Sequence, residues 1–431
     1  MKKVQGGGIA VGEYKIKTRS KRVQGKYFKN TNKIKNASKV FVAIGLIMLL
    51  IVSAVILGFS STNLTTFNKL NGRVSVSSAV VKPYKAMVTI ETKTKRILSS
   101  FNETEKLPMA STTKIMTAIV AIETIQDINK EFIIPNEAVG IEGSSMYLRK
   151  GEKLTLEELL YGLMLPSAND GAVALAIICA GSESNFANLM NEKAKEIGAV
   201  NTHFVTASGL HDVNHYTTAY DLALISAYAM QNPIFKKIVG TKSVMVKGSD
   251  PDKPRFLKNK QHLFEDKTIS DLGITITGVK TGFTPEAGRC LVSSATKNGL
   301  DTITVVLNAP DMFKSSADII KEVYGSYTMV SVLPPKKHIS TVICKNGESS
   351  QINIYSAQGF EYPASAGEIG KIKIKYNYPS VVLAPIEKDQ KIGEVEVLLN
   401  NEVIFKTDIL SIEEVKKTKV DNIFKKIIEN F

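Results

Sequence analysis

Cysteine and histidine are scarce in this chain of 431 residues. The three cysteines, Cys179, Cys290 and Cys344, are odd in number and far apart, so they predict neither a disulfide framework nor a cysteine metal site. Among the five histidines, His211 and His215 have a spacing close to one helical turn. They lie among Gly, Asp and Asn, however, and lack the glutamate of a zinc-binding helix motif. We therefore expect no metal and no cofactor.

Excess positive charge is sparse outside the first 39 residues. This tail holds twelve Lys or Arg and one acid, Glu13, which gives it a net charge of +11. The whole chain carries +14, so the remaining residues contribute only +3. A domain that binds nucleic acid concentrates basic residues on its folded surface. The distribution in this chain argues against that class, and we expect no nucleic-acid partner.

Charge is absent altogether from residues 40–59, which are largely apolar. A helix of this length spans about 30 Å, the thickness of the hydrocarbon core of a membrane. Because basic residues stay on the cytoplasmic side, the sequence predicts a single-pass protein with a cytoplasmic N-terminus and its folded part outside the cell. A cleavable signal peptide ending near Gly58 and Ser60 is the alternative. Signal peptides have shorter apolar runs, so we favour an uncleaved anchor.

The first of three short motifs pairs Ser111 with Lys114 at the start of an apolar-periodic segment. On a helix this spacing puts both side chains on one face, and the helix N-terminus favours developing negative charge. A serine hydroxyl becomes nucleophilic when a base takes its proton. Lys114 is such a base if burial and a second cation, such as Lys280, lower its pKa toward neutrality. Taken alone, the pair is better explained by a helix cap and a solvated lysine.

The second motif is Ser167-Ala168-Asn169. It follows a leucine-rich helical segment that Thr155 and Glu158 begin with a capping box, and an alanine-rich helical segment comes after it. We therefore expect the motif to lie on a loop between two helices. There Ser167 would relay a proton between the base and the leaving nitrogen, and the Asn169 amide would hold the substrate backbone. A plain polar turn is the alternative.

The third motif, Lys280-Thr281-Gly282, follows the alternating segment 274–279, which predicts a strand that ends at the motif. Lys280 offers positive charge to a substrate carboxylate, Thr281 adds a hydroxyl, and Gly282 lets a ligand approach the backbone. Each motif alone is weak evidence because short matches arise by chance. The ordered set of three, each in a suitable context, predicts a serine acyl-transfer site.

With this set the chain resembles the low-molecular-mass penicillin-binding proteins, which are serine-type D-alanyl-D-alanine carboxypeptidases. The resemblance covers residues 83–412 and includes the runs Pro-Met-Ala-Ser-Thr-Thr-Lys, Ser-Met-Tyr-Leu-Arg-Lys-Gly-Glu and Ser208-Gly209-Leu210-His211. It implies that the catalytic residues are Ser111, Lys114, Ser167 and Asn169. It implies that the substrate-binding residues are Lys280, Thr281, Gly282, Phe283 and Thr284. The N–H groups of Ser111 and Phe283 would form the oxyanion hole.

The chain departs from the family pattern in three places. Position 168 is Ala where the family usually has Gly, and position 283 is Phe where many members have His or Tyr. Because Phe283 would act through its backbone N–H, we expect little consequence there. The family more often combines a cleavable signal with a C-terminal anchor, whereas this chain predicts an N-terminal one.

The resemblance implies an α/β fold, in which an antiparallel sheet is flanked by helices as in DD-peptidases and β-lactamases, with a small C-terminal all-β domain. It also implies a bacterial membrane enzyme that removes the terminal D-Ala of peptidoglycan stem peptides and is inhibited covalently by β-lactam antibiotics. A serine β-lactamase, a DD-transpeptidase and an inactive wall-binding scaffold are alternatives. No Glu-x-x-x-Asn loop follows Asn169, which argues against fast β-lactam hydrolysis, and the intact motifs argue against an inactive site.

Composition and periodicity divide the chain into six segments. Residues 60–82 are rich in Ser, Thr and Asn, Pro334-Pro335 ends the catalytic domain, and short alternating runs follow. The last twenty residues carry an apolar helical stripe and a basic face, which predict an amphipathic helix that lies on the membrane or, alternatively, packs on the β domain. The segments are a basic tail (1–39), a transmembrane helix (40–59), a linker (60–82), a catalytic domain (83–333), a small β domain (336–411) and an amphipathic helix (412–431).

Overall fold

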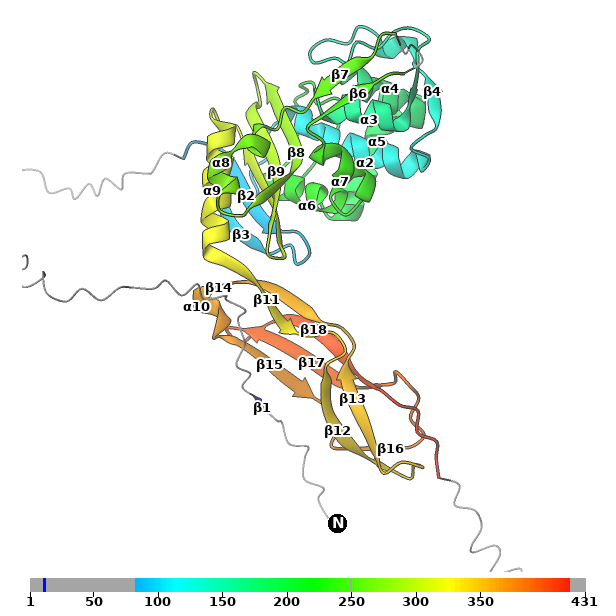
Figure 1. Ribbon diagram of the computed structural model, residues 1–431, viewed down its shortest axis with the longest axis vertical. Helices are drawn as coiled ribbons and strands as arrows, with labels where there is room; N and C mark the ends of the chain where they lie inside the picture. Colours follow the sequence, from blue (N-terminus) through cyan, green and yellow to red (C-terminus); the bar gives the residue numbers. More distant parts are fainter. Residues whose placement is uncertain (1–10, 13–81, 249, 251, 419–431) are drawn as a thin grey trace, which may run out of the picture. The chain divides into compact units, whose positions relative to one another are not determined.

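A computed structural model describes residues 11–12, 82–248, 250 and 252–418 (Figure 1). The predicted transmembrane helix and most of the predicted tail and linker lie outside these residues, as do residues 419–431. In the described part of the chain, no single helix is long and apolar enough to cross a membrane. One pair of consecutive helices, Asn169–Ala180 and Glu183–Ile197, is together long and apolar enough for a membrane span, but the two helices are bent by 84°.

The first domain is built on a five-stranded sheet whose neighbouring strands all pair antiparallel. The strand order is β3-β2-β10-β9-β8. The strands are β2 (Ala86–Glu91), β3 (Ile97–Phe101), β8 (Thr275–Thr284), β9 (Gly288–Lys297) and β10 (Leu300–Leu307). From its alternating residues the sequence predicts an opening hairpin with strands at 86–91 and 96–100. This hairpin is confirmed, since β2 has these bounds and β3 begins one residue later than expected.

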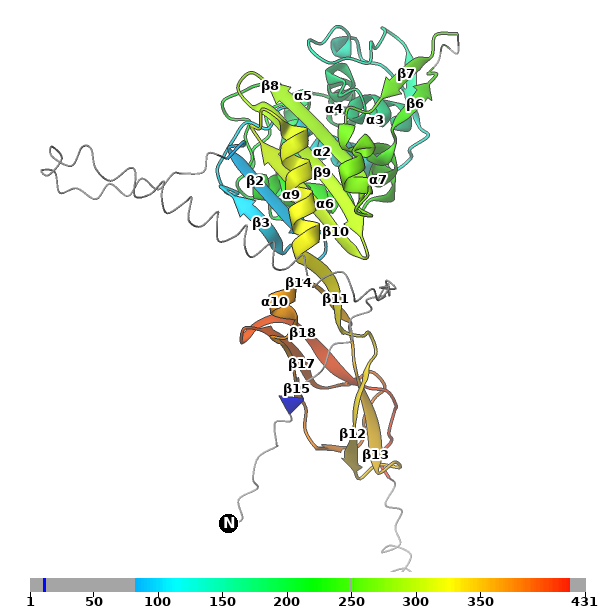
Figure 2. The same ribbon diagram turned by 60° about the vertical axis from the view of Figure 1, so that its left-hand side comes forward.

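Both faces of this sheet are buried, and helices cover each of them (Figures 1 and 2). Side chains alternate between the faces along each strand. Met87 and Leu291 belong to the cluster that includes helix α9 (Met312–Ser326). Val88 and Val292 belong to the cluster that includes α2 (Lys114–Ile125) and α6 (Ala219–Ala229). Figure 2 shows α9 lying along one face of the sheet. The predicted antiparallel sheet flanked by helices is therefore confirmed.

The other helices and two small two-stranded sheets, β4-β5 and β6-β7, complete the domain. Helix α2 (Lys114–Ile125) lies at its centre, and residues 114–122 are all buried. The remaining α-helices are α3 (Leu156–Met164), α4 (Asn169–Ala180), α5 (Glu183–Ile197), α6 (Ala219–Ala229), α7 (Pro233–Gly240) and α8 (Lys267–Ser270). The 3-10 helices are η1 (Ala110–Thr113), η2 (Asn136–Ala138) and η3 (His262–Glu265). The short strands are β4 (Glu131–Ile133), β5 (Lys153–Thr155), β6 (Ser243–Val246) and β7 (Arg255–Lys258).

The second domain is almost entirely β-structure, as predicted, and has its own apolar core. Its larger sheet has seven strands in the order β1-β15-β17-β18-β13-β12-β16, and β11 pairs with β14 in a separate sheet. The elements are β1 (Val11–Gly12), β11 (Tyr327–Leu333), β12 (His338–Lys345), β13 (Gln351–Ser356), β14 (Phe360–Ser365), α10 (Ala366–Ile369), β15 (Ile372–Asn377), β16 (Val381–Leu383), β17 (Lys391–Leu399) and β18 (Glu402–Ser411).

Two predicted boundaries differ from the structure. The boundary at Pro334-Pro335 falls after β11, but β11 pairs with β14 and so belongs with the second domain. The predicted amphipathic helix does not begin at Ile412, because Val415 forms a bridge with Ile386 and is 3% exposed. Val415 is thus part of the β-domain core rather than of an apolar helical stripe. The rest of the predicted helix lies outside the described residues.

Candidate active site

The first motif brings its serine and lysine together at the start of the central helix. Ser111 lies in η1 and Lys114 is the first residue of α2. The Lys114 side chain is fully buried, and its Nζ lies 3.0 Å from Ser111 Oγ. The same nitrogen donates to Asn169 Oδ1 at 2.7 Å and to the carbonyl oxygen of Ser208 at 2.5 Å. The distance to Ser111 is within reach for direct proton transfer.

The environment of Lys114 lowers its pKa to about 7. Burial is the largest cause, the positive charge of Lys260 adds to it, and the Asp170 carboxylate acts in the opposite direction. Lys260 is thus one cation that acts on Lys114. The predicted Lys280 is coupled to Lys114 as well, because the positive charge of Lys114 lowers the pKa of Lys280 and repulsion between two cations is mutual. A lysine with this pKa is half neutral near pH 7, as a general base requires.

The second motif joins this cluster through Asn169. Asn169 is the first residue of α4 rather than a loop residue as predicted, because the helix begins immediately after Ala168. Its Oδ1 accepts from Lys114, and its Nδ2 donates to the carbonyl oxygen of Glu142 at 2.7 Å. Ser167 has a positive φ of 71° and is 4% exposed, and its hydroxyl has no hydrogen-bond partner among the described residues. A proton relay through Ser167 stays a prediction.

The third motif lies inside strand β8, which runs on to Thr284 rather than ending at the motif. A Cβ added at Gly282 would lie 3.2 Å from the backbone nitrogen of Ser111 and 3.1 Å from the carbonyl oxygen of Met109. The strand thus passes directly beside the turn that carries the nucleophile, and glycine permits this approach. The proximity is consistent with the predicted oxyanion hole, which would use N–H groups from these two segments.

The remaining residues of the third motif differ in exposure. Lys280 is 2% exposed, and burial together with the positive charges of Lys114 and Lys260 lowers its pKa well below the usual value. A carboxylate arriving beside it would raise that pKa again, so its charge would depend on the ligand rather than being fixed. The Phe283 side chain is 63% exposed. Thr284 Oγ1 accepts from the N–H of Ala287 at 3.1 Å.

Known proteins are similar to this chain over most of its length. The sequence model described as D-alanyl-D-alanine carboxypeptidase matches residues 74–311, more than half of the chain. The chain belongs to this family. A second model, penicillin-binding protein 5, C-terminal domain, matches residues 327–417. This match begins at the first residue of β11, in agreement with the pairing of that strand.

Individual relatives of this carboxypeptidase agree with the family match. D-alanyl-D-alanine carboxypeptidase DacF of Bacillus subtilis is 30% identical over 380 residues, which cover 86% of this chain and 95% of that protein. DacD of Escherichia coli is 29% identical over 76% of this chain and 86% of its own length. The solved structure of penicillin binding protein 5 from Haemophilus influenzae is 26% identical, with a TM-score of 0.64, and covers 78% of this chain and 98% of that one.

Two site residues of this carboxypeptidase were not assigned a role from the sequence. Lys260 donates to Ser144 Oγ at 3.1 Å and acts electrostatically on Lys114, but it lies in a stretch that has no motif. Ser208 accepts from Lys114 through its backbone carbonyl, which a side-chain pattern does not reveal. The sequence did contain one hint, the glycine that follows Ser208. The structure shows why a glycine is needed there: Gly209 has a φ of +83°, and a Cβ on it would lie 2.1 Å from the carbonyl oxygen of Ala110.

The described residues contain no group of three or more His, Cys, Asp or Glu side chains that could hold a metal ion. All three cysteines are free, and Cys290 is fully buried in the core. Of the two histidines with helical spacing, His215 is 3% exposed and supports the nucleophile turn. Its Nδ1 accepts from the N–H of Val205 at 3.0 Å, so its Nε2 carries the proton and donates to Thr113 Oγ1 at 2.7 Å.

We expect His215 to make the stability of the protein depend on pH. Burial lowers its pKa from 6.5 to about 4. Between these values the unfolded chain binds a proton that the folded protein does not, so stability falls as the pH falls through this window. The loss attributable to His215 is about 3 kcal/mol at most. The measurement is urea unfolding at pH 7 and pH 4.5.

His215→Asn serves as the matched variant, because the amide oxygen can replace Nδ1 as an acceptor but does not titrate. Carboxylates titrate in both proteins, so the difference between the two pH profiles isolates the histidine. If the variant loses as much stability as the wild type between pH 7 and pH 4.5, His215 is not the cause.

Proposed function

We propose that this protein removes the terminal D-Ala of peptidoglycan stem peptides through an acyl-enzyme on Ser111. The observation that carries the proposal is the 3.0 Å contact between Ser111 Oγ and the Nζ of a buried lysine whose pKa is about 7. This arrangement couples a nucleophile to a base that is neutral in a large fraction of molecules at physiological pH.

The reaction follows from this geometry in two halves. Neutral Lys114 takes the hydroxyl proton while Ser111 Oγ attacks the carbonyl carbon between the two D-Ala residues. The N–H groups of Ser111 and Phe283 stabilise the oxyanion, and collapse breaks the carbon–nitrogen bond. The leaving amine receives the proton, directly from Lys114 or by way of Ser167, and free D-Ala departs. Water then hydrolyses the ester and restores Ser111.

Lys280 is suited to bind the terminal carboxylate of the substrate because its side chain is buried. A buried cationic group beside the strand edge gains more from a carboxylate than an exposed one does, because the local dielectric constant is lower. The carboxylate of a β-lactam antibiotic would take the same place, so penicillin would acylate Ser111 as well. The alternatives of a β-lactamase, a transpeptidase or an inactive scaffold are less favoured, because the named relatives of this chain are carboxypeptidases.

Incubation of the full-length protein in detergent with a diacyl-L-Lys-D-Ala-D-Ala peptide tests this function. The expected product is one D-Ala per peptide, detected by a D-amino-acid oxidase assay, and none with Ser111→Ala. Transfer of the acyl group to an added amine, without hydrolysis, would favour the transpeptidase instead.

We also propose that both ends of the chain contact the bacterial cell membrane, with the enzyme domain outside the cell. The uncharged run 40–59 and the basic tail before it support the first contact. The second would involve only residues 419–431, since Val415 belongs to the β-domain core. These residues combine an apolar set, Val420, Ile423, Phe424, Ile427, Ile428 and Phe431, with a basic set, Lys419, Lys425 and Lys426.

We expect the fragment 61–431 to sediment with anionic liposomes at low salt and to be released at high salt, because basic residues add electrostatic attraction that salt screens. The fragment 61–418 is the matched control, since it keeps the core residue Val415. It should remain in the supernatant. If both fragments stay in the supernatant at low salt, residues 419–431 are not an anchor.

A further inference from the structure

One segment of the site has not been given a role by the motifs. We call residues 142–149 the strap. Its backbone carbonyls hold Asn169 from one side: Glu142 accepts from Asn169 Nδ2 and Ser144 accepts from the N–H of Asn169, both at 2.7 Å. The Oδ1 of the same amide accepts from Lys114. The position of the strap therefore sets the orientation of an amide that contacts the general base.

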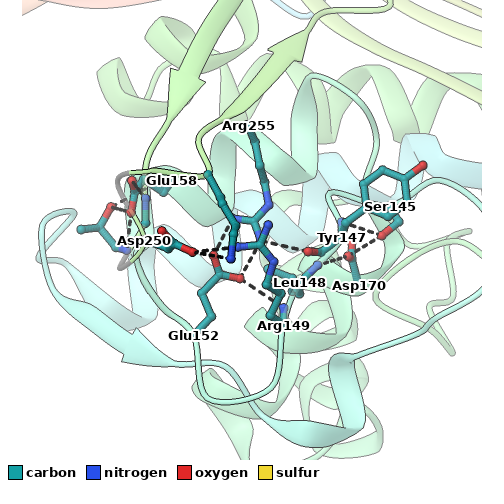
Figure 3. A network of polar contacts seen from close by, with 12 residues as sticks. Ser145, Tyr147, Leu148, Arg149, Glu152, Glu158, Asp170, Asp250 and Arg255 are labelled. Atoms are coloured by element: carbon teal, nitrogen blue, oxygen red, sulfur yellow. Dashed lines mark hydrogen bonds and ion pairs between the residues drawn. The ribbon is translucent and has the colours of Figure 1, made fainter.

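The middle of the strap is bound to helix α4 by the residue after Asn169. The Asp170 carboxylate is 1% exposed and accepts from Ser145 Oγ at 2.6 Å. It also accepts from the N–H groups of Met146 at 3.1 Å and Leu148 at 3.0 Å (Figure 3). A carboxylate that accepts several hydrogen bonds is well satisfied without a cationic partner.

The far end of the strap is held by an ion pair from a distant part of the chain. Arg255, at the start of β7, forms a two-pronged contact with Glu152, with distances of 2.5 and 2.6 Å (Figure 3). Its Nη2 also donates to the carbonyl oxygen of Tyr147 at 2.9 Å. Glu152 in turn accepts from the N–H of Arg149 at 3.1 Å. Both partners of the ion pair thus form a hydrogen bond with the strap.

This ion pair is costly to place where it is. The Arg255 and Glu152 side chains are 9% and 4% exposed, and burying two charges often gives no net stability over an apolar pair. The strap backbone is also held in an uncommon conformation, since Tyr147 has a φ of +60° although its side chain is 81% exposed. Such conformations persist only where the surroundings impose them. Both observations indicate that the ion pair fixes the geometry of the strap rather than adding stability to the fold.

We propose that Glu152 and Arg255 are a positioning pair for the reaction at Ser111. They fix the strap, the strap fixes the Asn169 amide, and that amide orients Lys114 and the substrate backbone. The proposal rests on the proposed function and adds to it two residues that none of the three motifs contains. Neither residue contacts Ser111 or Lys114, so both act only through the strap.

The test uses the full-length protein in detergent and the double variant Glu152→Gln/Arg255→Gln. The two amides leave no unpaired charge buried, so the melting temperature should stay within a few degrees of the wild type. Loss of the guanidinium frees the Tyr147 carbonyl and loosens the strap. We expect kcat/KM for the D-Ala-D-Ala peptide, and the rate of acylation by penicillin, to fall roughly 10- to 100-fold.

Arg149→Gln is the matched control. It removes an arginine side chain from the same strap, but that side chain forms an exposed ion pair with Asp250 at 3.6 Å. Exposed pairs contribute little, so this variant should keep the wild-type rates. Arg255→Lys is a second test should the double variant not fold, because lysine keeps the charge opposite Glu152 but cannot reproduce the planar fork. Its rates should also fall.

A double-mutant cycle with Asn169→Ala separates positioning from general destabilisation. If the pair acts through Asn169, adding the Gln/Gln substitutions to Asn169→Ala should lower acylation by less than about twofold more. An equally large loss in both backgrounds would overturn the proposal, as would wild-type rates in the Gln/Gln and Arg255→Lys variants. The wild type and Ser111→Ala, labelled with penicillin alongside, report on the proposed function separately, since its failure would remove labelling from the wild type itself.

Discussion

Replacement of Lys114 by arginine should lower the rate of acylation by penicillin by about 10²–10⁴-fold, the range expected for loss of a general base. Arginine keeps the positive charge but does not lose its proton near neutral pH. It would therefore preserve any purely electrostatic contribution and remove only the capacity to accept a proton from Ser111. Stopped-flow acylation with a fluorescent penicillin gives the rate. Near-normal acylation by Lys114→Arg would mean that Lys114 acts through its charge alone.

The pH dependence of the acylation rate tests whether Lys114 is the general base. The neutral form of Lys114 is the active one and its pKa is about 7, so acylation by the wild type should rise with pH through this value and then level off. Lys260 is one cause of the lowered pKa, and Lys260→Gln should move the midpoint to higher pH. A midpoint that does not move would show that Lys260 does not contribute to the lowered pKa of Lys114.

The parts of this protein that could be predicted from its sequence are those that depend on neighbouring residues. The Ser111–Lys114 spacing, the capping box of Thr155 and Glu158, and the first hairpin are all local, and each is present in the structure. Local backbone geometry and hydrogen bonding determine such features, so a few adjacent side chains suffice to indicate them.

The features that could not be predicted depend on residues far apart in the chain. Lys260 contacts Ser144 across 116 positions, and Arg255 contacts Glu152 across 103. No local pattern marks either lysine or arginine as different from a solvated surface residue. Ser208 contributes a backbone carbonyl, which every residue possesses, so only the fold reveals its role.

Two features of the β domain could not be predicted for further physical reasons. Strand β14 contains Pro363, and proline lowers the expectation of a strand because it lacks the N–H that a ladder needs. The strand is tolerated because it pairs with β11 alone. At the other end, Val415 fits a helical stripe by spacing but is buried against the β core. Tertiary packing determines the structure at Val415, and a periodicity over a few residues does not reveal that packing.

Ser111→Ala should abolish covalent labelling by penicillin, which is the largest effect that we expect from any single substitution. Ser111 Oγ is the only protein atom that the proposed mechanism joins covalently to the substrate, and without it no acyl-enzyme forms. In the wild type, intact-mass spectrometry should show one adduct with the mass of penicillin, and peptide mapping should place it on Ser111. Folding of the variant is verified by its melting temperature, since alanine in place of this half-exposed serine removes no core contact.

The lifetime of the wild-type adduct separates a carboxypeptidase from a β-lactamase. Fast hydrolysis of the penicillin ester in the class A β-lactamases uses an additional glutamate that positions water. In this chain the glutamates that follow Asn169 most closely, Glu183, Glu192 and Glu196, all lie on helix α5. We therefore expect the adduct to persist over many turnovers of the peptide substrate. An adduct that also forms in Ser111→Ala would place the nucleophile elsewhere, and one lost within a single peptide turnover would favour the β-lactamase.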